Sequence, residues 1–158
     1  MLGGYNVLGS GAYLEKTYDM SSFSMQGVAH VHLEFFKIDS WDNEYAYLHV
    51  AGQLAWQQML RYGTAHECGS AGFPYVTDGK VLASGSAPYS GGSALVRIDT
   101  TLNSAPDNEA WGIQNVRVYG SLASPAPPPS PPPAPPFRPL ARSERMRSTS
   151  FSASVRLQ

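Results

Sequence analysis

Cysteines, long apolar runs and a signal peptide, which would assign the sequence to a disulfide-rich, membrane or secreted class of protein, are scarce or not visible in it. Cys68 is the only cysteine in 158 residues, so no disulfide can form within the chain. This cysteine is either a small buried residue or one half of a pair whose partner lies upstream of the sequence. No apolar run approaches the ~20 residues that a membrane-spanning helix needs, so we expect no direct membrane insertion. The first residues also lack the basic start and hydrophobic stretch of a signal peptide.

Charge is also scarce, and it is unevenly distributed. Only 15% of the residues are charged, and the net charge is −1. Residues 1–136 contain six Lys and Arg against eleven Asp and Glu, whereas residues 137–158 contain five Arg against one Glu. Because nucleic-acid binding needs a basic face, the acidic character of the first part argues against nucleic acid as a partner.

Helical periodicity is almost absent, and residues 53–62 are the only window of helical composition. Strand patterns replace it. In residues 28–36, apolar side chains at every second position alternate with polar ones. Residues 45–50 and 113–119 alternate in the same way. Strands are also expected at residues 15–20, from moderate β-propensity, at residues 94–101, and at residues 54–57, because a turn at Ala51-Gly52 predicts a hairpin. The alternation in residues 113–119 places Ile113 and Tyr119 on the same strand face.

Residues 62–93 are rich in Gly and Pro, so they are predicted to be mostly loop, with short strands at residues 75–76 and 80–82. Seven or eight short strands with Gly-rich connections predict an all-β fold. Its expected form is an antiparallel β-sandwich of jelly-roll type.

The composition changes at Ser124. Residues 124–136 contain only Ser, Pro and Ala, which predicts a polyproline II rod on the order of 40 Å long at ~3.1 Å per residue. The Arg- and Ser-rich end is predicted to be disordered. The expected domains are therefore a β-sandwich module over residues 1–122, a Pro-rich linker over residues 123–137 and a disordered tail over residues 138–158.

Two short acidic clusters, each beside a tryptophan, lie at the edges of predicted strands. Residues 37–44 read Lys-Ile-Asp-Ser-Trp-Asp-Asn-Glu, and the tripeptide Asp-Asn-Glu returns in residues 107–112, Asp-Asn-Glu-Ala-Trp-Gly. Oxygen donors of this kind suit Ca²⁺. The candidate ligands are Asp39, Asp42, Asn43, Glu44, Asp107, Asn108 and Glu109. Not all seven can bind one ion, because neighbouring strand residues face opposite ways. The alternative is a pair of polar turns whose Asp and Asn side chains bond their own backbone.

Other residue types offer further candidates. His30-x-His32 with Glu34 offers a zinc site, although we favour a solvated outer strand face. The two tryptophans of the acidic clusters are expected to pack in the core and cover the calcium site. Aromatic side chains in predicted loops would form a sugar-binding platform. These candidates are Tyr62, Tyr75 and Tyr89.

The acidic clusters also carry a family resemblance, together with the start Leu-Gly-Gly-Tyr-Asn-Val at residues 2–7 and the pair Cys68-Gly69. They resemble extracellular jelly-roll modules of large surface proteins in ciliates and green algae. Related bacterial secreted proteins carry a similar Asp-Ser-Trp-Asp motif and a closing strand Glu-x-Trp-Gly-Ile-x-Asn-Val. The resemblance covers roughly residues 2–119. It departs from the family at Ala51-Gly52, where Asp-Gly is common. The Pro tract is similar to the hydroxyproline-rich rods of green-algal cell-wall glycoproteins.

The family is similar to galactose-binding-like and other carbohydrate-binding sandwiches, which often carry calcium. The resemblance therefore implies a non-catalytic recognition or adhesion module, stabilised by calcium, that binds glycan or an extracellular-matrix or surface protein. It also implies an extracellular or cell-surface location, so we expect the N-terminus to be incomplete.

Two other functions remain open. The chain would be a structural component of a cell wall or ciliary surface if it had no specific ligand. A glycoside hydrolase would use two of the carboxylates as acid and base. We expect no enzyme, because nothing marks a nucleophile.

Overall fold

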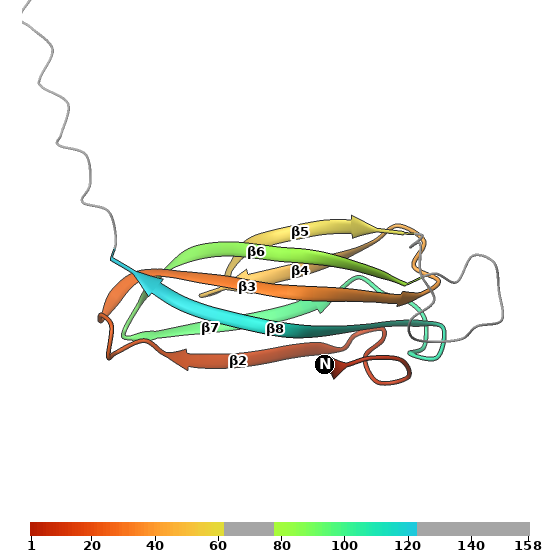
Figure 1. Cartoon of the computed structure of the whole chain (residues 1–158), viewed down its shortest axis with the longest axis horizontal. Coiled ribbons are helices and arrows are strands. Elements are labelled where there is room, and N and C mark those ends of the chain that lie inside the picture. The colour runs from red at the N-terminus through yellow and green to blue at the C-terminus, as the bar shows by residue number, and fades with distance from the viewer. Residues whose placement is uncertain (62–77, 123–158) are drawn as a thin grey trace, which may run out of the picture. The chain divides into compact units, whose positions relative to one another are not determined.

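A computed structural model describes residues 1–61 and 78–122, and strands account for most of these residues. Eight strands form two four-stranded antiparallel sheets (Figure 1). The first sheet has the order β1 (Leu2–Gly3), β8 (Glu109–Ser121), β3 (Gln26–Asp39) and β6 (Gly79–Ser90). The second sheet has the order β2 (Tyr13–Asp19), β7 (Ser93–Thr100), β4 (Glu44–Val50) and β5 (Gln53–Leu60).

This strand order is that of an eight-stranded jelly roll, because each sheet interleaves strands from the two halves of the chain. The predicted all-β antiparallel sandwich is therefore confirmed. The described ranges contain strands, turns and loops only, so no helix long and apolar enough to cross a membrane is found among them.

The core lies between the two sheets and follows from the alternation in the sequence. The apolar residues of β3 that share a face are all buried, and so are those of β4 and β7; they are Ala29, Val31, Leu33, Phe35, Ala46, Leu48, Val50, Ala94, Val96 and Ile98. The ring of Phe35 lies 5.6 Å from that of Trp111 and 5.8 Å from that of Trp41, measured between centroids. Both tryptophans are fully buried, as predicted.

The prediction of a mostly irregular segment over residues 62–93 is wrong for its second half. β6 runs for 12 residues and pairs with β3 along most of its length. Its buried positions are mostly small, as at Ala83 and Ala87, and Gly85 lies so close to β5 that a Cβ there would be 2.6 Å from the carbonyl oxygen of Ala55. Gly and Ala therefore allow close packing at these positions, although the same residues suggested a loop in the sequence.

A β-bulge in β8 also corrects the predicted alternation of that strand. His32 pairs with Arg117 while Glu34 pairs with Gln114, so β8 contains one extra residue at this point. Asn115 has a φ of 54°, a left-handed conformation that Asn adopts more easily than most residues. As a result Ile113 is buried in the core while Tyr119 is half exposed, so these two residues do not share a face.

Several predictions concern residues outside the described ranges. They are the domain boundaries beyond residue 122, the Pro-rich rod, the disordered tail, the short strand at residues 75–76, and the positions of Tyr62, Cys68 and Tyr75.

Candidate metal centre and sheet-face groove

The two acidic motifs meet at one end of β3 and β8, the inner strands of the first sheet. The first motif forms the turn between β3 and β4, and the second begins β8, which pairs with β3 so that Asp39 lies opposite Glu109. Asp42, Glu44 and Glu109 each offer a carboxylate oxygen, and these three oxygens lie within 4.8 Å of one another. The group can therefore hold a metal ion.

Burial sets the electrostatics of this three-carboxylate group. Glu44 and Glu109 are almost completely buried, while Asp42 is exposed. Burial raises the pKa of Glu44, and a hydrogen bond with the Asp42 side chain and the charge of Glu109 raise it further, against the opposing effect of backbone N–H groups. Two buried carboxylates side by side favour either a proton or a cation between them.

Backbone donors also contact these carboxylates. The N–H of Asp42 donates to Glu44 Oε2 at 2.6 Å, and the N–H of Ser104 donates to Glu109 Oε2 at 3.1 Å. These contacts tie side chains to the local backbone, as the alternative of polar turns expects, although Glu side chains make them in place of Asp and Asn. The geometry is therefore compatible with both interpretations of the motifs.

A buried lysine supplies a positive charge beside the group. Lys37 is 2% exposed, and its ammonium donates a hydrogen bond to the backbone carbonyl of Asp39. Burial lowers the pKa of Lys37, whereas the charges of Asp78, Asp39 and Glu44 act to raise it. Lys37 thus offsets part of the acidic charge. This role was not predicted, although a lysine stands directly before Ile-Asp-Ser-Trp in the sequence.

The remaining predicted ligands have other positions. Asn43 and Asp107 are exposed. Asp39 is buried with a φ of 65°, and its N–H donates to the Asp78 carboxylate at 3.2 Å. The Ser40 hydroxyl lies 3.0 Å from both the backbone carbonyl and the side-chain oxygen of Asn108. Asp39 and Asp107 therefore lie outside the three-carboxylate group, whereas a role for Asn43 and Asn108 as oxygen ligands stays a prediction.

The predicted sugar platform is not formed by Tyr89. This residue lies in β6, not in a loop; it is 5% exposed, and its hydroxyl donates to the carbonyl of Ser24 at 3.3 Å. It faces inward because β6 continues through the segment that was predicted to be irregular. Tyr62 and Tyr75 lie outside the described residues.

The histidines of β3 lie on the outer face of the first sheet. His32 Nε2 lies 2.8 Å from the Tyr119 hydroxyl, and His30 Nε2 lies 2.8 Å from the Ser121 hydroxyl. Both imidazoles stack on the Tyr119 ring, with centroids 5.0 Å and 5.6 Å away. Both histidines alternate with the buried Ala29, Val31 and Leu33, which agrees with the favoured interpretation of an outer strand face.

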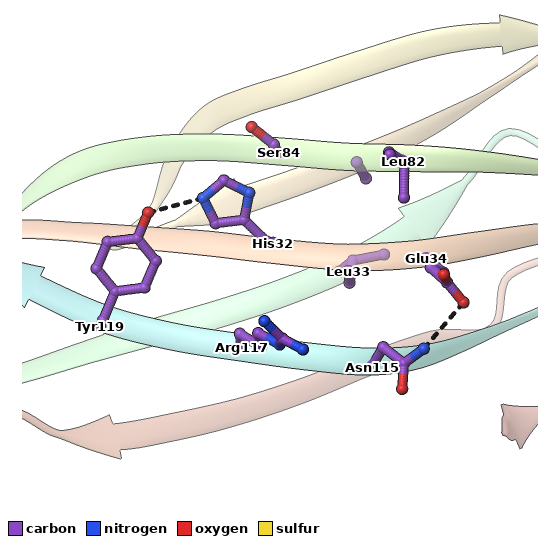
Figure 2. Close-up of a pocket in the computed structure, with 9 residues that line it drawn as sticks. His32, Leu33, Glu34, Leu82, Ser84, Asn115, Arg117 and Tyr119 are labelled. Atoms are coloured by element: carbon purple, nitrogen blue, oxygen red, sulfur yellow. Dashed lines mark hydrogen bonds between the residues drawn. The ribbon is translucent and has the colours of Figure 1, made fainter.

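A groove of about 420 Å³ follows this outer face. Figure 2 shows its walls, with His32 and Glu34 on β3, Leu82 and Ser84 on β6, and Asn115, Arg117 and Tyr119 on β8. Of these residues, His32 and Glu34 were candidate ligands in the sequence, and the others were not predicted to belong to a site. The groove residues come from three strands, so no single pattern in the sequence groups them. On β8 the predicted alternation does place Asn115, Arg117 and Tyr119 on one face, and the bulge turns Ile113 away from it.

Comparisons with known proteins identify no family for this chain. No family model matches the chain, and no curated protein matches it. A solved structure described as "EclA C-terminal domain; sugar-binding protein" overlaps 75% of this chain and 72% of its own, with 13% sequence identity and a TM-score of 0.49. A likeness of this degree assigns no ligand to the chain.

Proposed function

We propose that this chain is a non-catalytic, extracellular recognition or adhesion module that binds glycan or a surface protein, and that Ca²⁺ bound by Asp42, Glu44 and Glu109 stabilises it. The observation that carries the calcium assignment is the convergence of three carboxylates from motifs 65 residues apart in the chain. Ca²⁺ takes six to eight oxygen ligands, so backbone carbonyls and water would complete the coordination.

The charge balance supports a cation at this position. Glu44 and Glu109 are buried together, and ionising Glu44 beside Glu109 costs free energy, as its raised pKa indicates. The ammonium of Lys37 bonds the Asp39 carbonyl and is shared among three carboxylates. A divalent ion would offset the remaining repulsion.

The burial of the carboxylates also supports a binding role over catalysis. A glycoside hydrolase needs two carboxyl groups that flank the scissile bond. Glu44 and Glu109 are 5% and 3% exposed, so a polysaccharide cannot lie between them without opening the sandwich. Surface location and glycan recognition are supported by the motif resemblance, and the open groove offers a place for a ligand.

Thermal unfolding of the full-length chain tests the calcium site. We expect millimolar Ca²⁺ added after EDTA to raise the melting temperature by several degrees, since binding at a hundredfold excess over Kd contributes about 2.7 kcal/mol. Glu109→Gln keeps the shape of the side chain and should abolish the rise. Asp107→Asn removes the same charge outside the three-carboxylate group and should keep it. An identical melting temperature in EDTA and Ca²⁺ would leave the motifs as polar turns.

A glycan array probed with the full-length chain tests the recognition role. Binding to a defined set of glycans is expected. Self-association without any glycan binding would instead favour the alternative of a structural cell-wall or ciliary-surface component.

A further inference from the structure

The groove on the first sheet is built from three adjacent strands in register. His32 pairs with Ser84 on β6 and with Arg117 on β8, and Glu34 pairs with Leu82. The side chains of these residues therefore project from one face at neighbouring positions. The volume of about 420 Å³ lies within the range of about 300–1,000 Å³ typical of small-molecule sites.

Hydrogen bonds hold the polar walls of the groove in place. Glu34 Oε2 accepts the amide N–H groups of Gln114 at 2.7 Å and Asn115 at 3.0 Å, while Glu34 Oε1 lies 3.6 Å from the ammonium of Lys80. The hydrogen bond from Gln114 is the main cause that lowers the pKa of Glu34. The negative charge of Glu34 is thus already compensated within the sheet.

Arg117 gives the groove a positive charge that the pairing of Glu34 with Lys80 leaves unbalanced. Its guanidinium makes no hydrogen bond, ion pair or ring contact with any residue in the described ranges. Because Lys80 is paired with Glu34, the groove has one uncompensated positive charge. The surrounding module is acidic, with eleven Asp and Glu against six Lys and Arg over residues 1–136. A cationic groove on an acidic module selects an anionic ligand over a neutral one.

The neutral groups of the groove indicate what else the ligand carries. The Ser84 hydroxyl and the Asn115 amide can each bond a ligand hydroxyl. Leu82 is 74% exposed and Tyr119 is 50% exposed, which offers apolar and aromatic surface beside these polar groups. A sugar ring combines hydroxyl groups at its rim with an apolar C–H face, so it can contact both kinds of surface.

We propose that this groove binds an acidic saccharide, a sugar ring that carries a carboxylate or sulfate, with the anion on Arg117, the hydroxyls on Asn115 and Ser84, and the C–H face on Leu82 and Tyr119. The guanidinium fork matches a carboxylate or a sulfate through two parallel hydrogen bonds. The inference rests on the glycan-binding part of the proposed function and does not involve the calcium site.

Affinity electrophoresis of the full-length chain tests it, with polygalacturonate, dextran sulfate and neutral galactan as probes. We expect retardation by at least one of the two acidic polymers and not by galactan. Arg117→Gln should weaken that binding about tenfold or more, since hydrogen bonds to charged groups are the strong ones. Comparing the two acidic polymers tells carboxylate from sulfate.

Two variants separate the site from general charge effects. Lys16→Gln removes one positive charge from the second sheet, where Lys16 lies over the ring of Tyr18, and it should leave binding unchanged. Leu82→Ser changes an exposed side chain and should weaken binding severalfold without lowering the melting temperature. Arg117→Lys keeps the charge but loses the fork, so it should bind with intermediate affinity.

The outcomes that overturn the inference are distinct from those that overturn the proposed function. Glycan binding that Arg117→Gln leaves unchanged, or binding to neutral galactan alone, would refute this site while the recognition role stands. Equal binding of poly-glutamate would replace the saccharide with an acidic peptide. Binding to no glycan at all would refute both the site and the glycan-binding role.

Discussion

Glu44 is the residue at which the calcium hypothesis makes its sharpest prediction. Burial raises the pKa of Glu44, so the folded protein holds a proton there more tightly than the unfolded chain does. Without metal, its contribution to stability is therefore largest at low pH and is lost as pH rises through the raised pKa. Glu44→Gln removes the charge and keeps an acceptor for the Asp42 N–H, so we expect a higher melting temperature than wild type in EDTA at pH 7.5.

Added calcium should reverse the order of the two melting temperatures, so that wild type melts above Glu44→Gln. The wild type gains stability from Ca²⁺, whereas Glu44→Gln lacks one of the three carboxylates and should show little change. Melting curves of both proteins in EDTA and in millimolar Ca²⁺ give the four values needed. A variant less stable than wild type in both buffers would show that the Glu44 charge stabilises the fold without a metal.

Asn115 is the second residue with a sharp prediction, because its backbone is left-handed with a φ of 54°. Asn115→Ala should lower the free energy of unfolding by about 1 kcal/mol or more from this conformation alone, in addition to losing the hydrogen bond to Glu34. Asn115→Gly loses the same hydrogen bond but adopts this φ freely, so it should be the milder variant. Urea denaturation measures both. Equal losses would mean that the bulge is not strained.

At the scale of elements, the β4–β5 hairpin predicts opposite effects at two adjacent positions. Ala51 has a φ of 49° and Gly52 a φ of 77°, which is the pattern of a type I′ turn. Ala51→Asn should stabilise the protein by about 0.5–1 kcal/mol, because Asn is favoured at the first turn position. Gly52→Ala should destabilise it by about 1 kcal/mol, although no atom lies within 4 Å of the added Cβ.

Urea midpoints at an unchanged m-value report both hairpin effects as changes in stability. The N–H of Ala51 donates to the carbonyl of Leu95 at 2.7 Å, and Asn at this position retains that bond. If Ala51→Asn lowers the midpoint, packing of the Ala51 methyl group outweighs its backbone cost.

The elements also show how far sequence reasoning can go. The alternation in β3 predicted a strand with a buried face because its apolar residues are large and regularly spaced. Most of β6 was not predicted as a strand, because close packing selects small residues such as Gly85, which are also typical of loops. The bulge at Asn115 was not predictable from the residues of β8. Only the pairing of β8 with β3 shows that one residue of β8 is extra.

The candidate site was predictable to a similar degree. The repeated Asp-Asn-Glu suggested one shared site. Pairing of β3 with β8 brings the two motifs together, and Glu44 and Glu109 fall in one carboxylate group. The sequence could not say which predicted ligands face the same point, because the positive φ values of Asp39 and Asn43 change the side-chain directions in the turn. The groove was not predictable, since its residues come from three strands.

At the scale of the whole module, β3 runs between the two proposed sites. Asp39 lies at its end beside the three-carboxylate group, and His32 lies in the groove seven residues away, roughly 23 Å along a strand at ~3.3 Å per residue. Sites this far apart without shared partners act nearly additively. We therefore expect saccharide binding to be independent of calcium at temperatures well below unfolding.

Measuring the affinity of the full-length chain for the acidic polymer in EDTA and in Ca²⁺ tests this independence. The two values should agree within about twofold, since couplings between distant sites are usually within about 0.3–0.5 kcal/mol. Arg117→Gln should likewise keep the calcium-induced rise in melting temperature, and Glu109→Gln should keep saccharide binding. If EDTA weakened binding as much as Arg117→Gln does, the two sites would be coupled and their independence would be refuted.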